Sequence, residues 1–230
     1  MRISHTEIPA LVDVSCVRAN VSYGEVRQVA EAAVKYGFIC AFAMPCATKM
    51  MKEYLAGSGV RLGGVAGFPS GADTMEQKVD CAKYMASLGC DEIDMVINVG
   101  ALISGDRDYV EREIKEVVDA AAPIPVKAIL ECAYLDEGQI RYACEAAVSG
   151  GVAFVKSGSG WASKPTTVET VRIMKDAVGD RALIKAAGGV RSLAILEDMY
   201  GAGCRRFGIS LSSALTIMRE SCERDGVPFD

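Results

Sequence analysis

Short apolar runs alternate along this chain with longer segments in which apolar residues recur at helical spacing. The runs that we expect to form strands are 10–14, 38–44, 60–68, 92–98, 125–131, 152–156, 182–185 and 205–209. The segments that we expect to form helices are 22–36, 48–56, 73–89, 106–121, 136–150, 166–178, 192–202 and a last one from Ser212. The polar residues expected to cap helices are Ser22, Asp73, Asp106 and Asp136. Strands that are apolar on both faces are typical of a parallel sheet covered by helices.

Eight strand–helix units in 230 residues predict an α/β fold, a single (β/α)8 TIM barrel. No composition shift, linker or low-complexity segment interrupts the pattern, so we expect residues 1–230 to form one domain. The alternative is an open doubly wound sheet. That fold would have fewer units or a glycine fingerprint after the first strand, and Asp13-Val14-Ser15-Cys16 carries none.

Charged and polar residues interrupt the apolar strands close to their C-terminal ends. They are Asp13, Asp94, Asn98, Lys127, Glu131, Lys156, Lys185 and Ser210. In a parallel barrel these ends share one mouth, and buried charges there must pair with one another. Two interpretations follow from the residues alone: a set of internal ion pairs that closes the barrel, or an active site.

Two of the lysines precede glycine-rich turns. Lys156 is followed by Ser157-Gly158-Ser159-Gly160, and Lys185 by Ala186-Ala187-Gly188-Gly189. Such turns let backbone N–H groups approach a ligand closely, which is a common way to hold phosphate. A lysine attacks a carbonyl group only when neutral, and a second ammonium nearby lowers its pKa. The pattern favours Schiff-base chemistry, with Asp94 relaying protons through a water; charge and spacing leave open which lysine attacks.

Composition narrows the other chemistries. The net charge of −5 argues against nucleic acid or an anionic membrane as a partner. No apolar run approaches the length of a membrane span, and the N-terminus has no secretory pattern. With one histidine, His5, catalysis by histidine is nearly excluded. The nine cysteines lack metal-ligand spacing, so we expect reduced thiols in a cytoplasmic protein, with no metal and no cofactor.

Five segments resemble the deoxyribose-phosphate aldolase family: 67–72, 92–102, 127–132, 154–156 and 184–191. They occur in the family's order over essentially the whole chain. The resemblance implies a class I aldolase of carbohydrate catabolism on a TIM barrel. Such an enzyme cleaves 2-deoxy-D-ribose 5-phosphate reversibly to glyceraldehyde 3-phosphate and acetaldehyde, without a metal. The expected partners are therefore a sugar phosphate and aldehydes, with self-association into a dimer or tetramer.

The resemblance also implies roles for single residues. Lys156 falls on the Schiff-base lysine of the Phe-Val-Lys motif, and Lys185 on the lysine that tunes it. Asp94 falls on the aspartate of proton transfer, while Asp13 and Lys127 support this set. The residues expected to bind substrate and phosphate are Ser157, Ser159, Gly160, Gly188, Gly189 and Ser210.

The chain departs from the family pattern at three places. The usual Thr-Ser-Thr-Gly after the nucleophile is residues 157–160 here, followed by Trp161; Asp-His-Thr becomes 13–15; and Gly-Thr-Ser-Ser becomes 208–211, which ends in Leu211. We therefore expect a weaker preference for phosphorylated substrates. The alternatives are a class I aldolase acting on another sugar and a catalytically silent sugar-phosphate-binding barrel. The intact lysines and Asp94 argue against the silent form.

Overall fold

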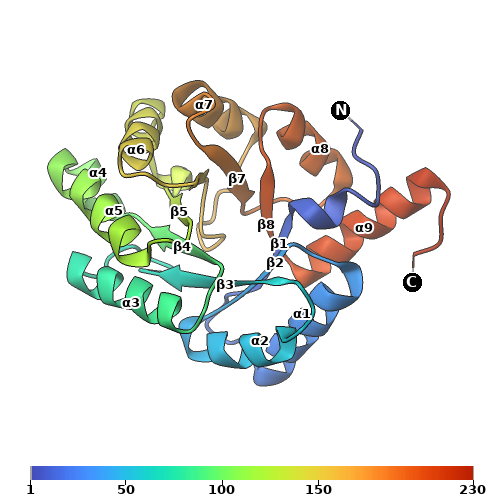
Figure 1. Ribbon diagram of the computed structural model, residues 1–230. Helices are drawn as coiled ribbons and strands as arrows, with labels where there is room; N and C mark the ends of the chain where they lie inside the picture. The colour runs from blue at the N-terminus through green and yellow to red at the C-terminus, as the bar shows by residue number, and fades with distance from the viewer. Residues whose placement is uncertain (1, 230) are drawn as a thin grey trace.

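The strands of the protein close into one parallel barrel in chain order, β1 to β8 (Figure 1). The computed structural model describes residues 2–229. The strands are β1 (Val12–Cys16), β2 (Cys40–Ala43), β3 (Arg61–Ala66), β4 (Glu92–Val96), β5 (Val126–Ile129), β6 (Phe154–Lys156), β7 (Leu183–Ala187) and β8 (Arg206–Ser210). β8 pairs with β1 to complete the ring. The predicted (β/α)8 barrel is confirmed, and the open sheet is excluded.

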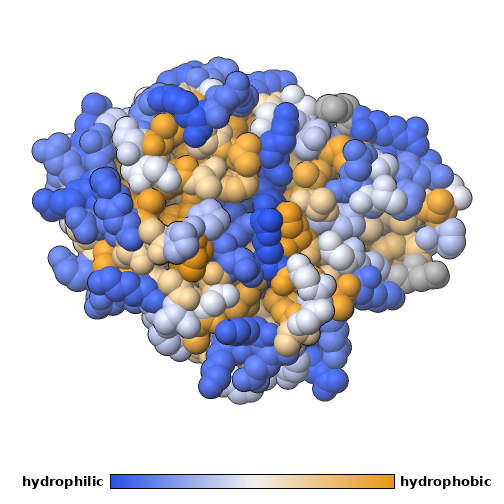
Figure 2. Space-filling view, in the orientation of Figure 1, coloured by the Kyte–Doolittle hydropathy of each residue, from blue (hydrophilic) through white to orange (hydrophobic). Residues whose placement is uncertain are grey.

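Helices surround the barrel on its outside (Figure 1). They are α1 (Tyr23–Tyr36), α2 (Thr48–Leu55), α3 (Met75–Ser87), α4 (Val99–Ile103), α5 (Arg107–Ala121), α6 (Glu137–Ser149), α7 (Val168–Val178), α8 (Leu193–Gly201) and α9 (Leu211–Asp225). Short 3-10 turns are η1 (Ile8–Leu11), η2 (Pro45–Ala47) and η3 (Cys132–Tyr134). Figure 2 shows hydrophilic residues around the rim of the view, and in its middle hydrophobic residues on both sides of a column of hydrophilic ones. None of the helices described here has the length and apolarity to cross a membrane.

Helix caps agree with the sequence at most positions and differ at three. Ser22, Asp106 and Asp136 each accept a hydrogen bond from the backbone three residues on, as predicted. The expected cap Asp73 is wrong: Thr74 caps α3 in a reciprocal capping box with Gln77. This choice satisfies two backbone groups rather than one.

The two other differences concern Ser210 and Asn98, polar residues that cap helices. Ser210 caps α9, so this helix begins at Leu211, one residue before the predicted start at Ser212. Asn98, expected to end a strand, instead caps the unpredicted short helix α4. Both side chains accept backbone N–H groups that the first turn of a helix leaves without partners. The first strand also starts later than expected, because residues 10 and 11 belong to the turn η1.

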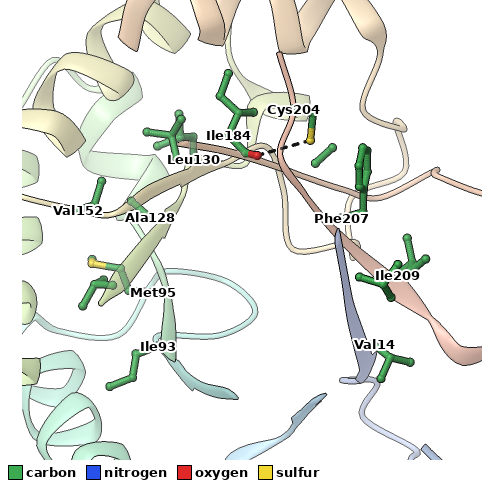
Figure 3. Close-up of a cluster of buried hydrophobic side chains, with 14 of the residues drawn as sticks. Val14, Ile93, Met95, Ala128, Leu130, Val152, Ile184, Cys204, Phe207 and Ile209 are labelled. Carbon is green, nitrogen blue, oxygen red and sulfur yellow. Dashed lines mark hydrogen bonds between the residues drawn. The ribbon is translucent and has the colours of Figure 1, made fainter. Parts of the chain in front are cut away.

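Alternation along each strand separates the hydrophobic core from the barrel interior. Residues facing outward pack under the helices (Figure 3), among them Val14, Ile93, Met95, Ala128, Ile184 and Phe207. Their neighbours in sequence point inward, because successive side chains of a strand lie on opposite faces. The inward set includes Asp13, Asp94, Lys127 and Lys185. These four charged residues therefore lie within their strands and not at the strand ends. Of the residues predicted at strand ends, only Lys156 and Ser210 are the last residue of a strand.

Candidate active site

A cluster of seven charged residues fills the barrel interior. The charged cluster comprises the cations Lys127, Lys156, Lys185 and Arg206 and the carboxylates Asp13, Glu92 and Asp94, all buried. The strand register sets their neighbours: Lys156 lies beside Lys185, and Lys185 beside Arg206. Four cations against three carboxylates leave one positive charge without a partner of its own if every group is ionised.

Asp94 is the carboxylate through which the lysines meet. Its Oδ2 accepts hydrogen bonds from Lys156 Nζ at 2.8 Å and from Lys185 Nζ at 2.7 Å. Lys127 Nζ lies 3.3 Å from Oδ1 but is not aligned for a hydrogen bond. Oδ1 is the buried side-chain oxygen within residues 2–229 that has no hydrogen-bond partner. Burial raises the pKa of Asp94, but these three lysines outweigh it and hold the pKa well below its usual range.

Asp13 is the second carboxylate that pairs with several cations of the charged cluster. Its Oδ2 lies 2.7 Å from Lys185 Nζ and 3.3 Å from Lys127 Nζ, and its Oδ1 accepts from Arg206 at 2.7 Å. Burial would raise the pKa of Asp13, but Lys127, Lys185 and Arg206 together lower it to about 2. Lys185 thus contacts two carboxylates.

Lys156 has weaker charge compensation than Lys185. Among residues 2–229 its one carboxylate partner is Asp94, through the oxygen that Lys185 also contacts. Burial lowers the pKa of Lys156, Asp94 raises it, Lys185 lowers it again, and the result is about 8 instead of 10.5. Burial also lowers the pKa of Lys127, yet Asp13 and Asp94 outweigh burial and hold it above its usual range. The amine at position 156 is therefore far more easily neutral than the one at 127.

Sequence reasoning missed Glu92 and Arg206. Glu92 pairs with Lys127, and its Oε2 lies 3.2 Å from Arg206. Arg61 reaches the same carboxylate from β3, at 2.6 Å from Oε1. The available signal was alternation: Glu92 is two residues before Asp94 on β4 and shares its inward face.

Aromatic rings lie against the lysine amines, another feature that sequence analysis missed. The Phe42 ring lies 4.3 Å from Lys185 Nζ and 4.9 Å from Lys127 Nζ, while Phe68 lies 6.0 Å from Lys156 Nζ. A cation over a ring face is attracted by the ring's quadrupole. Gly63 makes room for Phe42, because a Cβ there would lie 2.3 Å from the ring.

The charged cluster opens into a main cavity of about 880 Å³ at the mouth of the barrel. The predicted site residues that line it are Asp13, Asp94, Lys156, Ser159, Gly160, Lys185, Gly188, Gly189 and Ser210. Lys127 does not line it, and its amine contacts Asp13, Asp94 and Glu92. The Lys156 side chain keeps 8% of its surface exposed, against 1% for Lys185. The Lys156 amine, whose pKa burial lowers to about 8, is thus also the more accessible of the two.

Ser157 lies outside the main cavity, unlike the other residues predicted to bind substrate. Its Oγ is buried, accepts from the backbone N–H of Ala187 at 3.0 Å and lies 2.8 Å from Thr166 Oγ1. It therefore joins the ends of β6 and β7. Ser159 is held by the buried carboxylate of Glu131, which accepts its backbone N–H at 3.1 Å. Sequence alone gives no sign of which serine faces the cavity.

The end of the main cavity away from the charged cluster, called the distal end below, is formed by the loops after β7, β8 and β1. Gly188 and Gly189 have φ of 88° and 90°, a left-handed backbone that glycine adopts without strain. Ser210 caps α9 there, and its Oγ lies 3.0 Å from Ser212 Oγ. Leu211 also lines this end, as do Arg18 and Arg191. Exposed backbone N–H groups at a helix start, together with glycine turns, suit an anionic group.

One group of potential metal ligands lies inside the barrel. Ligand atoms of Asp13, Cys40 and Glu92 lie within 4.8 Å of one another. Two cations, Lys127 and Arg206, already occupy the space between the carboxylates. Burial and the charge of Asp13 also raise the pKa of the Cys40 thiol well above its usual value, and a protonated thiol is a poor ligand. The donor set therefore does not fit a metal ion.

The chain is similar to aldolases in sequence and in structure. A family model described as DeoC/LacD family aldolase matches residues 15–205. The deoxyribose-phosphate aldolase of Klebsiella pneumoniae is 43% identical over 91% of this chain and 86% of that protein. The deoxyribose-phosphate aldolase of Sinorhizobium medicae is 41% identical over 97% and 91%. The solved structure of deoxyribose phosphate aldolase from Aeropyrum pernix matches with a TM-score of 0.87 and 27% identity, covering 97% of this chain and 94% of that one.

Proposed function

The chain belongs to the DeoC/LacD aldolase family, and we propose that it is a metal-independent class I aldolase. Its proposed reaction is the reversible cleavage of 2-deoxy-D-ribose 5-phosphate to glyceraldehyde 3-phosphate and acetaldehyde. The observation that carries the proposal is the position of Lys156: its amine opens on the main cavity and shares its carboxylate contact with Lys185.

Lys156 is the proposed nucleophile. Its neutral amine attacks C1 of the open-chain sugar aldehyde, and the adduct takes up one proton and loses water to give a protonated Schiff base. The pKa of about 8 leaves a useful fraction of neutral amine near pH 7. Lys185 has the tuning role, because its ammonium lowers the pKa of Lys156 and competes for Asp94 Oδ2.

The Schiff base then serves as the electron sink for cleavage of the C2–C3 bond. The hydroxyl at C3 loses its proton, C3 becomes the aldehyde carbon of glyceraldehyde 3-phosphate, and the bonding electrons form an enamine on C1–C2. Protonation at C2 and hydrolysis release acetaldehyde and regenerate Lys156. Asp94 stays ionised because three lysines lower its pKa, so its role is to accept hydrogen bonds from Lys156 and Lys185 and to relay these protons through a water in the main cavity, which it lines.

The distal end of the main cavity is the proposed place for the sugar's phosphate. Gly188 and Gly189 offer backbone close to the ligand, and the start of α9 at Ser210 adds N–H groups and a hydroxyl. Ser159 and Gly160 line the wall between this end and Lys156. Ser157, which does not line the main cavity, acts by holding β6 against β7.

Trapping the Schiff base tests the assignment. The protein is incubated with acetaldehyde and borohydride, and the peptides are analysed for an added ethyl group. We expect the label on Lys156 and no turnover in Lys156→Ala. Lys164, exposed on the same β6–α7 loop, serves as the control, since its labelling measures background modification and Lys164→Ala retains turnover. Label on Lys185 in place of Lys156 contradicts the assignment.

An aldolase acting on another sugar remains the second candidate, and Leu211 is the observation in its favour. The leucine lines the distal end where the family pattern has a serine. Cleavage assays with 2-deoxyribose, its 5-phosphate and other sugar phosphates separate the two candidates. Turnover of a different substrate only, with Lys156 still trapped, supports the second.

We also propose that the protein works in the cytoplasm as a homodimer or homotetramer. Its nine cysteines are free thiols, which is the usual state in a reducing compartment. The Aeropyrum pernix aldolase is described as tetrameric. Light scattering coupled to gel filtration measures the assembly, and a monomer at micromolar concentration argues against it.

A further inference from the structure

Arg18 is a cation in the main cavity that the proposed mechanism does not use. It belongs to the loop between β1 and α1 and lines the same cavity as Lys156, Gly188 and Gly189. Its side chain is 63% exposed and pairs with Glu25 in the first turn of α1. Glu25 lines the cavity as well. An arginine held in place at the edge of a cavity, rather than buried in it, is available to a ligand.

Trp161 attaches the Arg18 loop to the catalytic side of the cavity. Its indole Nε1–H donates to the backbone oxygen of Val17 at 2.9 Å, one residue before Arg18. Its ring meets Phe68 edge-on at 6.4 Å between centroids, and its backbone N–H donates to Ser159 Oγ at 3.1 Å. Phe68 in turn lies against Lys156. One side chain thus links the β1, β3 and β6 loops around the cavity.

We propose that Arg18 binds the terminal phosphate of the substrate, that Trp161 positions it, and that Glu25 competes with the phosphate for its guanidinium. This inference rests on the proposed function for its substrate class. A guanidinium pairs with phosphate through two parallel hydrogen bonds, and a dianionic phosphate is a stronger partner than one carboxylate. Exposed arginine–glutamate pairs are weakly held, so Arg18 exchanges partners readily.

The strength of the preference for phosphorylated over neutral substrates depends on Arg18, Glu25 and Trp161. Arg18 supplies attraction at the distal end, where Leu211 offers no hydroxyl. Glu25 opposes it, since its carboxylate repels the phosphate and occupies Arg18. The preference for phosphate therefore depends on a residue pair of the β1–α1 segment as well as on the glycine loops after β7.

Steady-state kinetics provide the first test, as the ratio of kcat/KM for 2-deoxyribose 5-phosphate over 2-deoxyribose. Arg18→Gln is expected to lower this ratio between about ten- and a hundredfold, which corresponds to one charge-assisted contact. Glu25→Gln is expected to raise it, and the rise should vanish in the double variant. A gain that persists without Arg18 contradicts the proposed competition, and an unchanged ratio in Arg18→Gln overturns the proposal.

The chain offers a matched control in the Arg27–Glu31 pair. Arg27 lies on α1, is equally exposed at 63%, and pairs with a glutamate, but it does not line the cavity. Arg27→Gln and Glu31→Gln are expected to leave the ratio within about twofold, because screened charges outside the cavity have little effect. A fall in Arg27→Gln equal to that in Arg18→Gln assigns the effect to net charge and overturns the proposal.

Trp161→Phe isolates the positioning role. The substitution removes the donor to Val17 and keeps an aromatic ring against Phe68. We expect a higher KM for the phosphorylated sugar with a smaller change in kcat, and a phosphate preference between those of the wild type and Arg18→Gln. An equal loss of kcat with both sugars places Trp161 with the catalytic residues instead.

Phosphate binding itself separates this inference from the proposed function. Trp161 is the one tryptophan of the chain, so its fluorescence reports on the cavity directly. Titration with inorganic phosphate is expected to give a saturable change in the wild type and in Arg27→Gln, with at least tenfold weaker binding in Arg18→Gln. Equal binding in Arg18→Gln overturns the inference whether or not the enzyme is active. Absence of turnover and trapping, with phosphate binding intact, contradicts the aldolase function alone.

Discussion

Lys156 and Lys185 lie opposite each other on neighbouring strands, and both ammonium groups contact the same oxygen of Asp94, at 2.8 and 2.7 Å. Lys185 has a second carboxylate, Asp13, at 2.7 Å. The two adjacent lysines therefore differ in the number of carboxylates that compensate their charge. Burial and the Lys185 ammonium lower the pKa of Lys156 to about 8, and its single carboxylate contact offsets this only in part.

The first prediction is a pH profile. Schiff-base formation requires neutral Lys156, so the rate of trapping with acetaldehyde and borohydride should rise about tenfold per pH unit below pH 8 and level off above it. The sign follows from the amine, which is protonated below its pKa. A rate that keeps rising toward pH 10.5 shows an ordinary lysine.

Removal of the neighbouring ammonium should reverse this tuning. In Lys185→Leu, Asp94 Oδ2 contacts Lys156 alone, and the repulsion that lowers its pKa is gone. We expect the midpoint of the trapping profile to move above 8 toward 10.5, and the rate at pH 7 to fall at least tenfold. Lys115→Leu, which breaks an exposed pair with Asp119, is the control and keeps the wild-type midpoint.

Asp13 is expected to determine acid stability. Asp13→Asn leaves Lys127, Lys185 and Arg206 short of one buried carboxylate, which should lower the free energy of unfolding by about 3–5 kcal/mol at pH 7. The folded-state pKa of Asp13 is about 2 against an ordinary 3.8. The contribution of its ionised carboxylate to the free energy of unfolding is therefore complete above pH 4 and is lost as pH falls toward 2.

Urea unfolding of both proteins between pH 7 and pH 3 measures this effect. The gap in stability between wild type and Asp13→Asn should narrow as the pH falls. Asp119→Asn, which alters an exposed pair, should differ from the wild type by less than about 1 kcal/mol at every pH. A constant gap down to pH 3 contradicts the assigned ionisation of Asp13.

Gly63 is predicted to be intolerant of a methyl group. A Cβ at this position would lie 2.3 Å from the Phe42 ring, which lies against Lys185 and Lys127. Gly63→Ala should lower the free energy of unfolding by about 1–3 kcal/mol and reduce turnover by displacing the ring. Gly201→Ala, with no atom within 4 Å of the new carbon, should be neutral or slightly stabilising.

Leu211 tests the departure from the family pattern. In Leu211→Ser a hydroxyl replaces an apolar side chain at the distal end of the cavity, beside Ser210. One added contact to phosphate should raise kcat/KM for 2-deoxyribose 5-phosphate by about tenfold and leave 2-deoxyribose nearly unaffected. Equal changes with both sugars show that the residue does not face the phosphate.

The order and type of elements were present in the sequence, because local patterns specify them. Apolar runs such as 152–156 between helical segments predicted β6 and the barrel, and Ser22, Asp106 and Asp136 marked helix starts through hydrogen bonds within three residues. The resemblance pointed to Lys156, Lys185 and Asp94. The extent of a single domain over residues 1–230 and the chemical roles of these side chains stay predictions.

Only the tertiary structure decided how the charges are shared. Lys185 reaches two carboxylates and Lys156 one, Glu92 and Arg206 complete the charged cluster, and Ser157 does not line the main cavity. These facts depend on distances between side chains from strands far apart in the chain. A pKa is a sum over neighbours in space, and sequence spacing does not carry that sum once strands close into a barrel.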